Sequence, residues 1–222
     1  MRNRFRSLFA KASFQFPQTV LSTHFDMSVL CCPVEELERL MSWLYADDDL
    51  CMNMLLDLCV VDRLHYGVDE WEGVHATERG YDRARSPLDA QNIEDFDGRF
   101  EMVYHLLSTS QHVRVRVKVR LQNASVLVPS MTPIWPNANW YEREAFDLFG
   151  IRFKNHPDLR RILTDYGFVG YPMRKDFPLP GRVEIRYDAS LARCLYEPVT
   201  IKNRVSTPKV IRKDDQRLTI KD

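Results

Sequence analysis

Hydrophobic and polar residues alternate along two neighbouring stretches near the middle of the chain, and this alternation predicts a β-hairpin. In residues 112–120, "HVRVRVKVR", every second residue is a valine, so the valines would face one side of a sheet and the basic residues the other. Residues 99–107, "RFEMVYHLL", form a second strand-like run, and residues 108–111 join the two. A connection of this length is typical of an antiparallel pair.

The N-terminal half of the chain predicts a strand, a helix and a second strand. Apolar residues alternate over residues 22–32, which indicates a strand. Pro33 then precedes acidic residues and an apolar stripe at helical spacing, which is typical of a helix that packs on a sheet. Residues 53–64 predict a buried strand. We therefore expect an α/β (α+β) domain with a mixed sheet and packed helices. The helical stripe consists of Val34, Leu37, Leu40, Met41 and Leu44.

The periodic pattern is lost in two long segments. Residues 67–98 are charged, punctuated by glycine and aperiodic, so we expect a surface loop or insertion. After Gly150 prolines recur; residues 156–163, "HPDLRRIL", predict a helix and residues 183–187, "VEIRY", a short strand. This segment has too few apolar residues to offset its own ordering entropy, so we expect it to lie on another protein.

The predicted organisation has three parts. Residues 1–24 form a basic N-terminal arm, residues 25–150 form the α/β domain with the insertion at 67–98, and residues 151–222 form an extended C-terminal arm that docks on a partner. The first 25 residues contain no acid, which is also typical of a mitochondrial transit peptide, although we expect an arm. Their basic residues are Arg2, Arg4, Arg6 and Lys11.

Charge and cysteine content argue against several classes of function. Lys plus Arg and Asp plus Glu both number 31 in the 222 residues, and this zero net charge does not indicate a nucleic-acid binder. The basic stripe of residues 114–120 has no interleaved aromatic residues, so we expect a solvated face or one that pairs with acidic residues on a neighbouring element. No window approaches the roughly 20 apolar residues of a membrane span. The cysteines form no CxxC pair, so we expect reduced, mostly buried thiols and no metal site. They are Cys31, Cys32, Cys51, Cys59 and Cys194.

A dense group of charged and aromatic residues, "NWYEREAFDLFGI" at 139–151, is the strongest candidate for chemistry. The pattern predicts a helix over 140–149, with Asn139 and Glu142 as an N-terminal capping pair and Gly150 just past the C-terminus. Arg143 and Asp147 are four residues apart, so we expect them to pair on the helix surface.

Acid–base catalysis would require two carboxylates that converge on one space, and a metal site would require a further ligand such as a histidine one turn away. The predicted helix offers neither, so we expect no catalytic, cofactor-binding or metal-binding residue in this chain. We expect instead that arginines bind the carboxylates, or that the cluster forms a protein–protein interface. A stand-alone enzyme that uses Glu142, Glu144 and Asp147 is the alternative. The expected arginine partners are Arg160, Arg161 and Arg174.

Residues 126–199 resemble the signature region of the 30 kDa subunit of respiratory complex I, the proton-pumping NADH:ubiquinone oxidoreductase. Four motifs carry the resemblance: E-R-E-x-x-D-x-x-G, H-P-D-L-R-R-I-L, D-Y-G-F and R-K-D-F-P-L. Two segments depart from the family, because residues 67–98 are longer than its usual connection and the tail after Val199 does not match its common ending. The matching positions include Glu142, Arg143, Glu144, Asp147, Gly150, His156, Pro157, Asp158, Arg160, Arg161, Asp165, Tyr166, Gly167, Arg174, Lys175, Asp176, Phe177 and Pro178.

The resemblance implies a non-catalytic scaffold in the quinone-reducing module of the hydrophilic arm. The chain itself would bind no cofactor, whereas other subunits would use FMN, iron–sulfur clusters and ubiquinone. Its C-terminal arm would lie along the 49 kDa-type subunit, near the iron–sulfur subunits, with no nucleic acid and no membrane span of its own. The expected location is the matrix side of the mitochondrial inner membrane, with the bacterial cytoplasmic side as the alternative. An equivalent subunit of a related NDH or membrane-bound hydrogenase complex is the other candidate.

Overall fold

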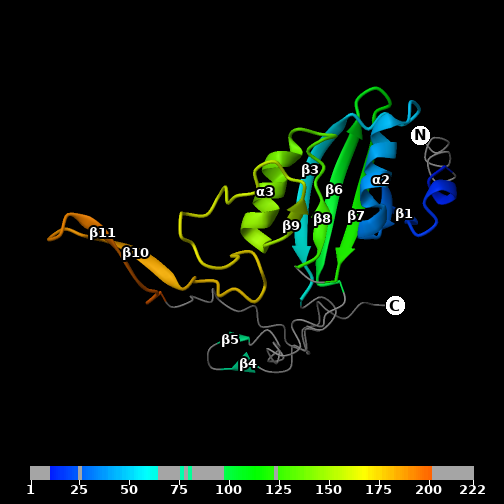
Figure 1. Ribbon diagram of the computed structural model, residues 1–222. Helices are drawn as coiled ribbons and strands as arrows, with labels where there is room; N and C mark the ends of the chain where they lie inside the picture. Colours follow the sequence, from blue (N-terminus) through cyan, green and yellow to red (C-terminus); the bar gives the residue numbers. More distant parts are fainter. Residues whose placement is uncertain are drawn as a thin grey trace. The chain divides into compact units, whose positions relative to one another are not determined.

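The alternating segments form one five-stranded sheet in the order β1-β2-β7-β6-β3 (Figure 1). Strands β2 and β7 are parallel, and the other neighbours are antiparallel, so the sheet is mixed as predicted. The predicted hairpin of β6 and β7 is confirmed. The strands are β1 (Val20–His24), β2 (Met27–Cys32), β3 (Met54–Asp62), β6 (Phe100–Ser108) and β7 (Val113–Leu121).

This sheet belongs to the first of two units, formed by Met1–Leu64 and Glu94–Phe177. The second unit comprises His65–Ile93 and Pro178–Asp222. The computed structural model describes residues 11–24, 27–64, 98–122 and 125–201, together with the backbone of the short paired strands β4 (Ala76–Thr77) and β5 (Gly80–Tyr81).

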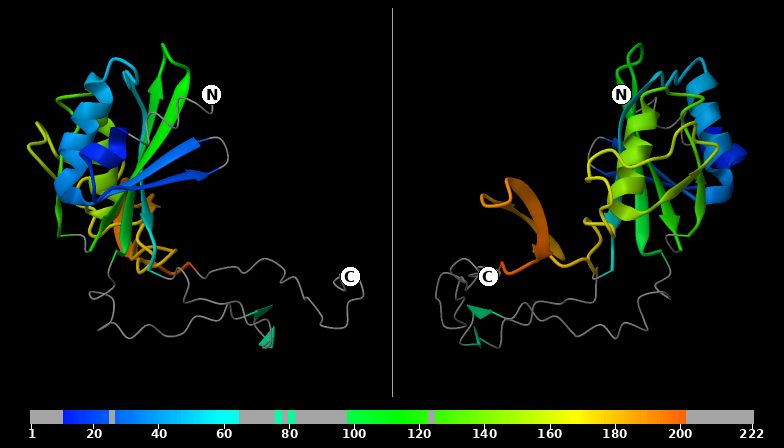
Figure 2. Two further views of the ribbon diagram at one scale, coloured as in Figure 1. Left: turned by 90° about the vertical axis from the view of Figure 1, so that its right-hand side faces the viewer. Right: turned by 60° about the vertical axis from the view of Figure 1, so that its left-hand side comes forward.

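Helix α2 (Val34–Ala46) lies against one face of the sheet, as the apolar stripe predicts (Figure 2). Four of the five stripe residues, Leu37, Leu40, Met41 and Leu44, are fully buried. They share one hydrophobic core with the inward residues of the sheet, because every second residue of β7 faces that side. The inward valines are Val113, Val115, Val117 and Val119.

Helix α3 (Ala138–Phe149) covers the outer edge of the sheet at β3 (Figure 1). An edge strand presents backbone carbonyls that would otherwise remain without partners. Here the side chain of Asn137 donates to the carbonyl of Leu55 at 2.7 Å, and the hydroxyl of Tyr141 donates to that of Leu56 at 2.9 Å. The residues at the start of α3 therefore provide hydrogen-bond donors for two carbonyls of the edge strand β3.

The domain begins earlier than predicted. Residues 11–15 are helical, and Ala12 and Phe16 lie in the core. Strand β1 pairs with β2 along its length, so residues 20–24 belong to the sheet and not to an N-terminal arm. The single strand predicted over 22–32 is wrong for a related reason, because alternation persists through both strands of a pair and does not mark where one ends.

The domain also ends later than predicted. Strand β9 (Arg152–Lys154) pairs in parallel with β8 (Leu127–Pro129), and Ile151 and Phe153 are buried in the core. Residues up to Phe177 belong to the same unit, so the boundary predicted at 150/151 is wrong. The predicted helix over 156–163 is also wrong, because that segment has no regular secondary structure.

In the second unit, strands β10 (Val183–Asp188) and β11 (Arg193–Pro198) form an antiparallel hairpin. The strand predicted over 183–187 is therefore confirmed, whereas its partner was missed. Most side chains of the hairpin are exposed, in keeping with the expectation of little core. Most of the predicted insertion at 67–98 and the tail from residue 202 lie outside the described residues.

Candidate functional site

The charged signature is organised by helix α3, which begins at Ala138, two residues earlier than predicted. Asn137 occupies the N-cap position without a side-chain capping bond, so the predicted cap by Asn139 and Glu142 is wrong. The carboxylate of Glu142 instead faces inward. Gly150 ends the helix in the left-handed conformation at φ 79°, as predicted.

Asp147 is the centre of a hydrogen-bond network that ties the following chain to α3. Its side chain is fully buried and accepts backbone N–H bonds from Ile162 at 3.0 Å, Leu163 at 2.7 Å and Thr164 at 2.8 Å. The hydroxyl of Thr164 and the guanidinium of Arg161, at 2.9 Å, donate to the other oxygen. Burial alone would raise the pKa of Asp147, but the hydrogen bonds from 162–164 outweigh it and lower the pKa to about 2.

Two arginines bind backbone carbonyls on the same segment. The pair of Arg143 and Asp147 that their spacing predicts is wrong. Arg143 instead donates to the carbonyls of Arg160 and Arg161 at 3.1 Å each. Arg161 also reaches the carbonyl of Gly170 at 3.0 Å. These bonds explain why residues 156–163 do not form a helix, because side chains of α3 hold the amides and carbonyls that a helix would pair internally.

Glu142 lies in a different environment from Asp147. Its carboxylate is fully buried and accepts bonds from the hydroxyl of Ser130 and the backbone N–H of Met131, both at 2.6 Å. Burial raises its pKa to about 7 against the effect of these two bonds. The nearest ring nitrogen of His156 is 3.9 Å away, which is too long for a hydrogen bond.

The side chain of His156 is fully buried and holds the start of the segment. Its Nδ1 accepts the backbone N–H of Asp158 at 3.0 Å, so Nε2 carries the proton and donates to the carbonyl of Asn139 at 3.3 Å. Burial lowers the pKa of His156, and the ring is therefore neutral at neutral pH. This neutral ring does not compensate the charge of Glu142.

A second network binds the end of the segment to the sheet. Arg99 donates to both oxygens of the buried Asp62, at 3.0 and 2.8 Å, and also to Asp176. The backbone N–H of Lys175 donates to Asp62 at 2.8 Å. The connection joins the end of β3, and the residue just before β6, to residues more than a hundred positions further along the chain than Asp62.

Arg174 and Gly150 fit together at the end of α3. Arg174 donates to the carbonyl of Phe149 at 2.6 Å, and its guanidinium lies 4.3 Å from the ring centre of Tyr171. A Cβ atom on Gly150 would lie 2.6 Å from that guanidinium and 2.7 Å from the Tyr171 ring, so only glycine fits here. Arg160, in contrast, is exposed and pairs only with the exposed Asp158 among the contacts described. Of the three arginines expected to bind carboxylates of α3, Arg161 is the one that does so among the described contacts.

The networks fix residues 156–177, called the strap below, without a core beneath each of its residues. Several apolar side chains of the strap consequently face outward, and Tyr166 is 98% exposed. Exposed apolar surface of this kind commonly marks a protein–protein contact. Asp165 is also exposed, Gly167 has a positive φ of 80°, and the Phe177 ring lies against Gly170. The outward apolar residues of the strap are Ile162, Leu163, Tyr166, Val169 and Met173.

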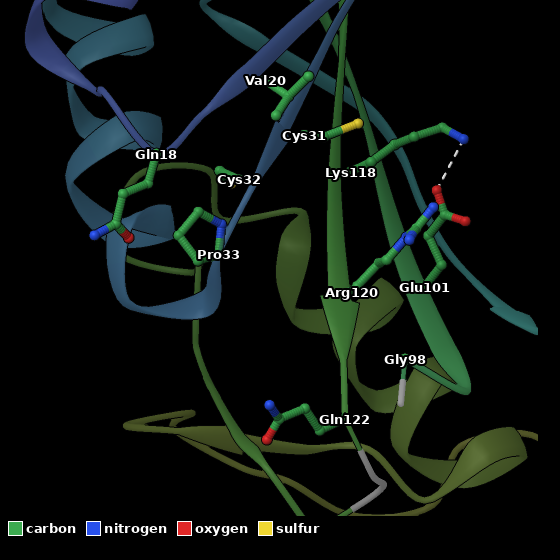
Figure 3. Close-up of a pocket in the computed structure, with 10 residues that line it drawn as sticks. All are labelled: Gln18, Val20, Cys31, Cys32, Pro33, Gly98, Glu101, Lys118, Arg120 and Gln122. Carbon is green, nitrogen blue, oxygen red and sulfur yellow. Dashed lines mark ion pairs between the residues drawn. The ribbon is translucent and has the colours of Figure 1, made fainter. Parts of the chain in front are cut away.

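A cavity of about 640 Å³ lies at the ends of β2, β6 and β7, and no signature residue lines it (Figure 3). In it Lys118 pairs with Glu101 at 2.8 Å, and Arg63 reaches the same carboxylate at 3.0 Å. One acidic side chain therefore binds two basic ones on this part of the face predicted to be solvated. The lining residues are Gln18, Val20, Cys31, Cys32, Pro33, Gly98, Glu101, Lys118, Arg120 and Gln122.

The cysteines are all free, but the prediction that most are buried is wrong. Only Cys32 is buried, whereas Cys59 and Cys194 are exposed. Cys59 lies in a group with Asp57 and His105 whose donor atoms are within 4.8 Å of one another, which sequence reasoning missed. A D-x-C spacing on a strand could have suggested two of the three residues; the histidine is supplied by pairing between strands.

The fold and the strap define a class of protein: an α+β domain that holds an irregular segment rigidly and turns its apolar side chains outward. These features are typical of a subunit in a larger assembly. None of the helices in the described ranges is long and apolar enough to cross a membrane.

The chain belongs to the family of the 30 kDa subunit of respiratory-chain NADH dehydrogenase, whose model matches residues 30–183. It is 47% identical to a NADH-quinone oxidoreductase subunit of Legionella pneumophila over 198 residues, which cover 89% of this chain and 87% of that protein. It is 51% identical to the subunit of the same name from Coxiella burnetii over 171 residues, which cover 77% and 75%. The resemblance seen in the sequence is thereby confirmed.

Two solved structures share the fold. A trypsin-resistant fragment (1-134) of Nqo5 aligns with a TM-score of 0.50 at 23% identity, covering 70% of this chain and 99% of the fragment. A chain of the membrane-bound sulfane sulfur reductase, an archaeal respiratory membrane complex, aligns with a TM-score of 0.56 at 19% identity, covering 78% and 85%.

Proposed function

We propose that the chain is a non-catalytic core subunit of a proton-pumping NADH:quinone oxidoreductase, in the quinone-reducing module of its hydrophilic arm. Membership of the 30 kDa family carries this proposal, since the relatives named above are subunits of NADH-quinone oxidoreductase. The role is a scaffold for the 49 kDa-type and iron–sulfur subunits. On this proposal the chain itself binds no cofactor, and FMN, iron–sulfur clusters and quinone are bound by other subunits of the complex.

The strap supports a scaffold because it combines a fixed backbone with an apolar outer surface. A flexible segment would lose conformational entropy on binding, whereas a segment already held by Asp147, Arg143 and Arg99 loses little. Tyr166 suits such a surface, because a rigid aromatic side chain buries much area at low entropic cost.

The engagement of the signature charges supports the absence of a catalytic site in this chain. Asp147 accepts bonds from protein donors at both oxygens, and so does Glu142. Catalytic carboxylates must reach a substrate, and both side chains here are fully buried. Asp147 therefore acts on the strap, and Glu142 acts on the residues that follow β8.

The bacterial relatives bear on the location. We propose a peripheral position on the cytoplasmic side of a bacterial membrane, the alternative given above. The matrix side of the mitochondrial inner membrane stays a prediction. The fold shared with the archaeal sulfane sulfur reductase fits a related complex as parent, but the much higher identity to the NADH-quinone oxidoreductase subunits favours NADH as electron donor.

The experiment is complementation of a host that lacks its own copy of this subunit. The tagged chain is captured from membranes in mild detergent, its partners are identified by mass spectrometry, and inhibitor-sensitive NADH:quinone activity is measured. Tyr166→Asp tests the strap, and Phe14→Asp is the matched control because Phe14 is 89% exposed and lies outside the matched residues 30–183.

We expect the unmodified chain and Phe14→Asp to recover the 49 kDa-type and iron–sulfur subunits with full activity. Tyr166→Asp should reduce the amount of assembled complex several-fold while the melting temperature of the isolated chain is unchanged, because the side chain contacts solvent in the free subunit. Recovery of the chain alone would contradict the proposed subunit role. Equal assembly of the two variants would show that the strap around Tyr166 is not a contact surface.

A further inference from the structure

The face of the sheet opposite the core carries three metal-capable side chains at the β3–β6 pair. Asp57 and Cys59 are two positions apart on β3 and therefore project to the same face. His105 lies directly opposite Asp57 in the antiparallel register. One donor atom from each residue, an oxygen, a sulfur and a nitrogen, lies within 4.8 Å of the other two.

A β-bulge creates this juxtaposition. The pairing of β3 with β6 shifts between Leu55 and Asp57, so Leu55 is opposite Leu106 and Asp57 is opposite His105. In a regular ladder Leu56 would occupy the place opposite His105, and Asp57 would turn toward the core. Bulges commonly re-aim a side chain next to a functional site. The irregularity thus supplies an observation independent of the donor set.

We propose that Asp57, Cys59 and His105 bind a divalent ion of the zinc type, with water in the remaining position. Carboxylate, thiolate and imidazole are the three side-chain donors that zinc takes in proteins, at about 2.0–2.3 Å each. Ligand atoms around such an ion are roughly 3.3–3.8 Å apart. Donors already within 4.8 Å reach this spacing by small side-chain rotations.

The protonation states suit binding. Burial, followed by the charge of Arg116, lowers the pKa of His105, so the ring is neutral and can donate an electron pair to the ion. Burial raises the pKa of Cys59, so without metal its thiol is protonated, and the ion takes the place of the thiol proton.

The neighbouring charges indicate an exchangeable site. Arg116 lies in register with His105 and weakens the attraction for a cation, whereas the carboxylate of Glu144 on α3 acts on Cys59 in the opposite direction. Lys118 is also near Cys59, but it is paired with Glu101 at 2.8 Å. With three ligands on the face away from the core, the ion is not required for folding. Zinc-type ions should therefore be removable by a chelator without loss of structure.

The first test uses the full chain, reduced and metal-free, with Co²⁺ as a spectroscopic probe and Zn²⁺ as competitor. We expect one Co²⁺ per chain, with a thiolate-to-cobalt charge-transfer band that Zn²⁺ abolishes. Cys59→Ser should remove the band, and His105→Gln should weaken binding by more than about tenfold. Cys194→Ser and His24→Gln are controls at exposed positions elsewhere and should bind like the unmodified chain.

A second measurement needs no substitution. Alkylation of each cysteine is followed by mass spectrometry in the free chain and in the assembled complex, with and without Zn²⁺. Zinc should slow the modification of Cys59 at least tenfold and leave the exposed Cys194 unchanged. An equal rate at Cys59 with and without zinc would overturn the site, and so would a charge-transfer band that persists in Cys59→Ser. These outcomes do not depend on whether the chain assembles with partners.

Discussion

Asp147→Asn is the most informative perturbation of the strap, because one carboxylate holds three consecutive backbone amides, a hydroxyl and a guanidinium. Asparagine has the same shape but no charge, and one of its oxygens becomes an NH₂ group. That group would face donors and cannot accept from them. The substitution therefore leaves buried or half-buried donors without a partner.

The size of the effect follows from the pKa of Asp147, which falls from 3.8 to about 2 in the folded protein. At about 1.36 kcal/mol per pKa unit, the ionised form contributes about 2.5 kcal/mol. Removing one partner from a buried charge pair costs about 3–5 kcal/mol. We therefore expect Asp147→Asn to lower the free energy of unfolding at pH 7 by about 2.5–5 kcal/mol. This is a large part of a typical total of about 5–15 kcal/mol.

The assay is urea unfolding of the full chain between pH 7 and pH 3. Because the folded pKa is depressed, the contribution of Asp147 is fully present above the unfolded value of 3.8 and is lost as the pH falls toward about 2. About half of it should be lost at pH 3, so the gap between the variant and the unmodified chain should narrow there.

Glu144→Gln is the matched control, since Glu144 is an exposed carboxylate on the same helix. Exposed substitutions of this kind usually change stability by less than about 0.5 kcal/mol. If Asp147→Asn were no more destabilising than Glu144→Gln, or if its effect did not diminish in acid, the network around Asp147 would not hold the strap.

Three further predictions address single contacts. Glu142→Gln should match the stability of the unmodified chain near pH 4 and exceed it by up to about 3 kcal/mol at pH 8. The folded pKa of Glu142 is raised to about 7, so its contribution to stability is present below pH 4.5 and is lost as the pH rises through 7. A pH series of urea melts measures this difference. Gly150→Ala should lower the free energy of unfolding by about 1–3 kcal/mol in the same melts, because φ is 79° and Arg174 occupies the place of a Cβ atom. Asparagine tolerates this φ but also carries a Cβ, so a Gly150→Asn variant as stable as the unmodified chain would contradict the steric part of this reasoning. Arg161→Lys should lower stability by about 1–3 kcal/mol because lysine cannot reach Asp147 and the Gly170 carbonyl together, whereas Arg160→Lys should be neutral in thermal melts.

The sheet and α2 could be predicted because their pattern depends only on periodicity. The valines of β7 alternate with basic residues, and the apolar stripe of α2 repeats at helical spacing. The residues of each element are therefore sufficient to predict which of its sides is buried. The order of the strands is not recorded in this way. Nothing local shows that β2 runs parallel to β7, or that β1 and β2 are two strands.

The helix predicted over 156–163 failed because the partners of its backbone lie elsewhere in the chain. Pro157 and Asp158 are residues that commonly begin a helix, and the local prediction was reasonable on those grounds. Asp147 instead accepts hydrogen bonds from the amides of Leu163 and its neighbours. Arg143 donates to two backbone carbonyls of the segment. A side chain that competes for backbone groups from a distant position has no signature at the segment it controls.

The same competition accounts for the density of charge in residues 139–151, which first suggested an active site. A strap without its own core must satisfy its backbone polar groups through side chains, because each buried amide or carbonyl left unpaired is costly. Carboxylates can accept several amides at once, and guanidinium groups can donate to several carbonyls. Asp147 and Arg143 from α3, with Asp62 at the far end, meet this need. The motif is thus dense in charge because the backbone groups of an irregular segment find few partners within the segment, and the apolar residues of the strap are left to face outward.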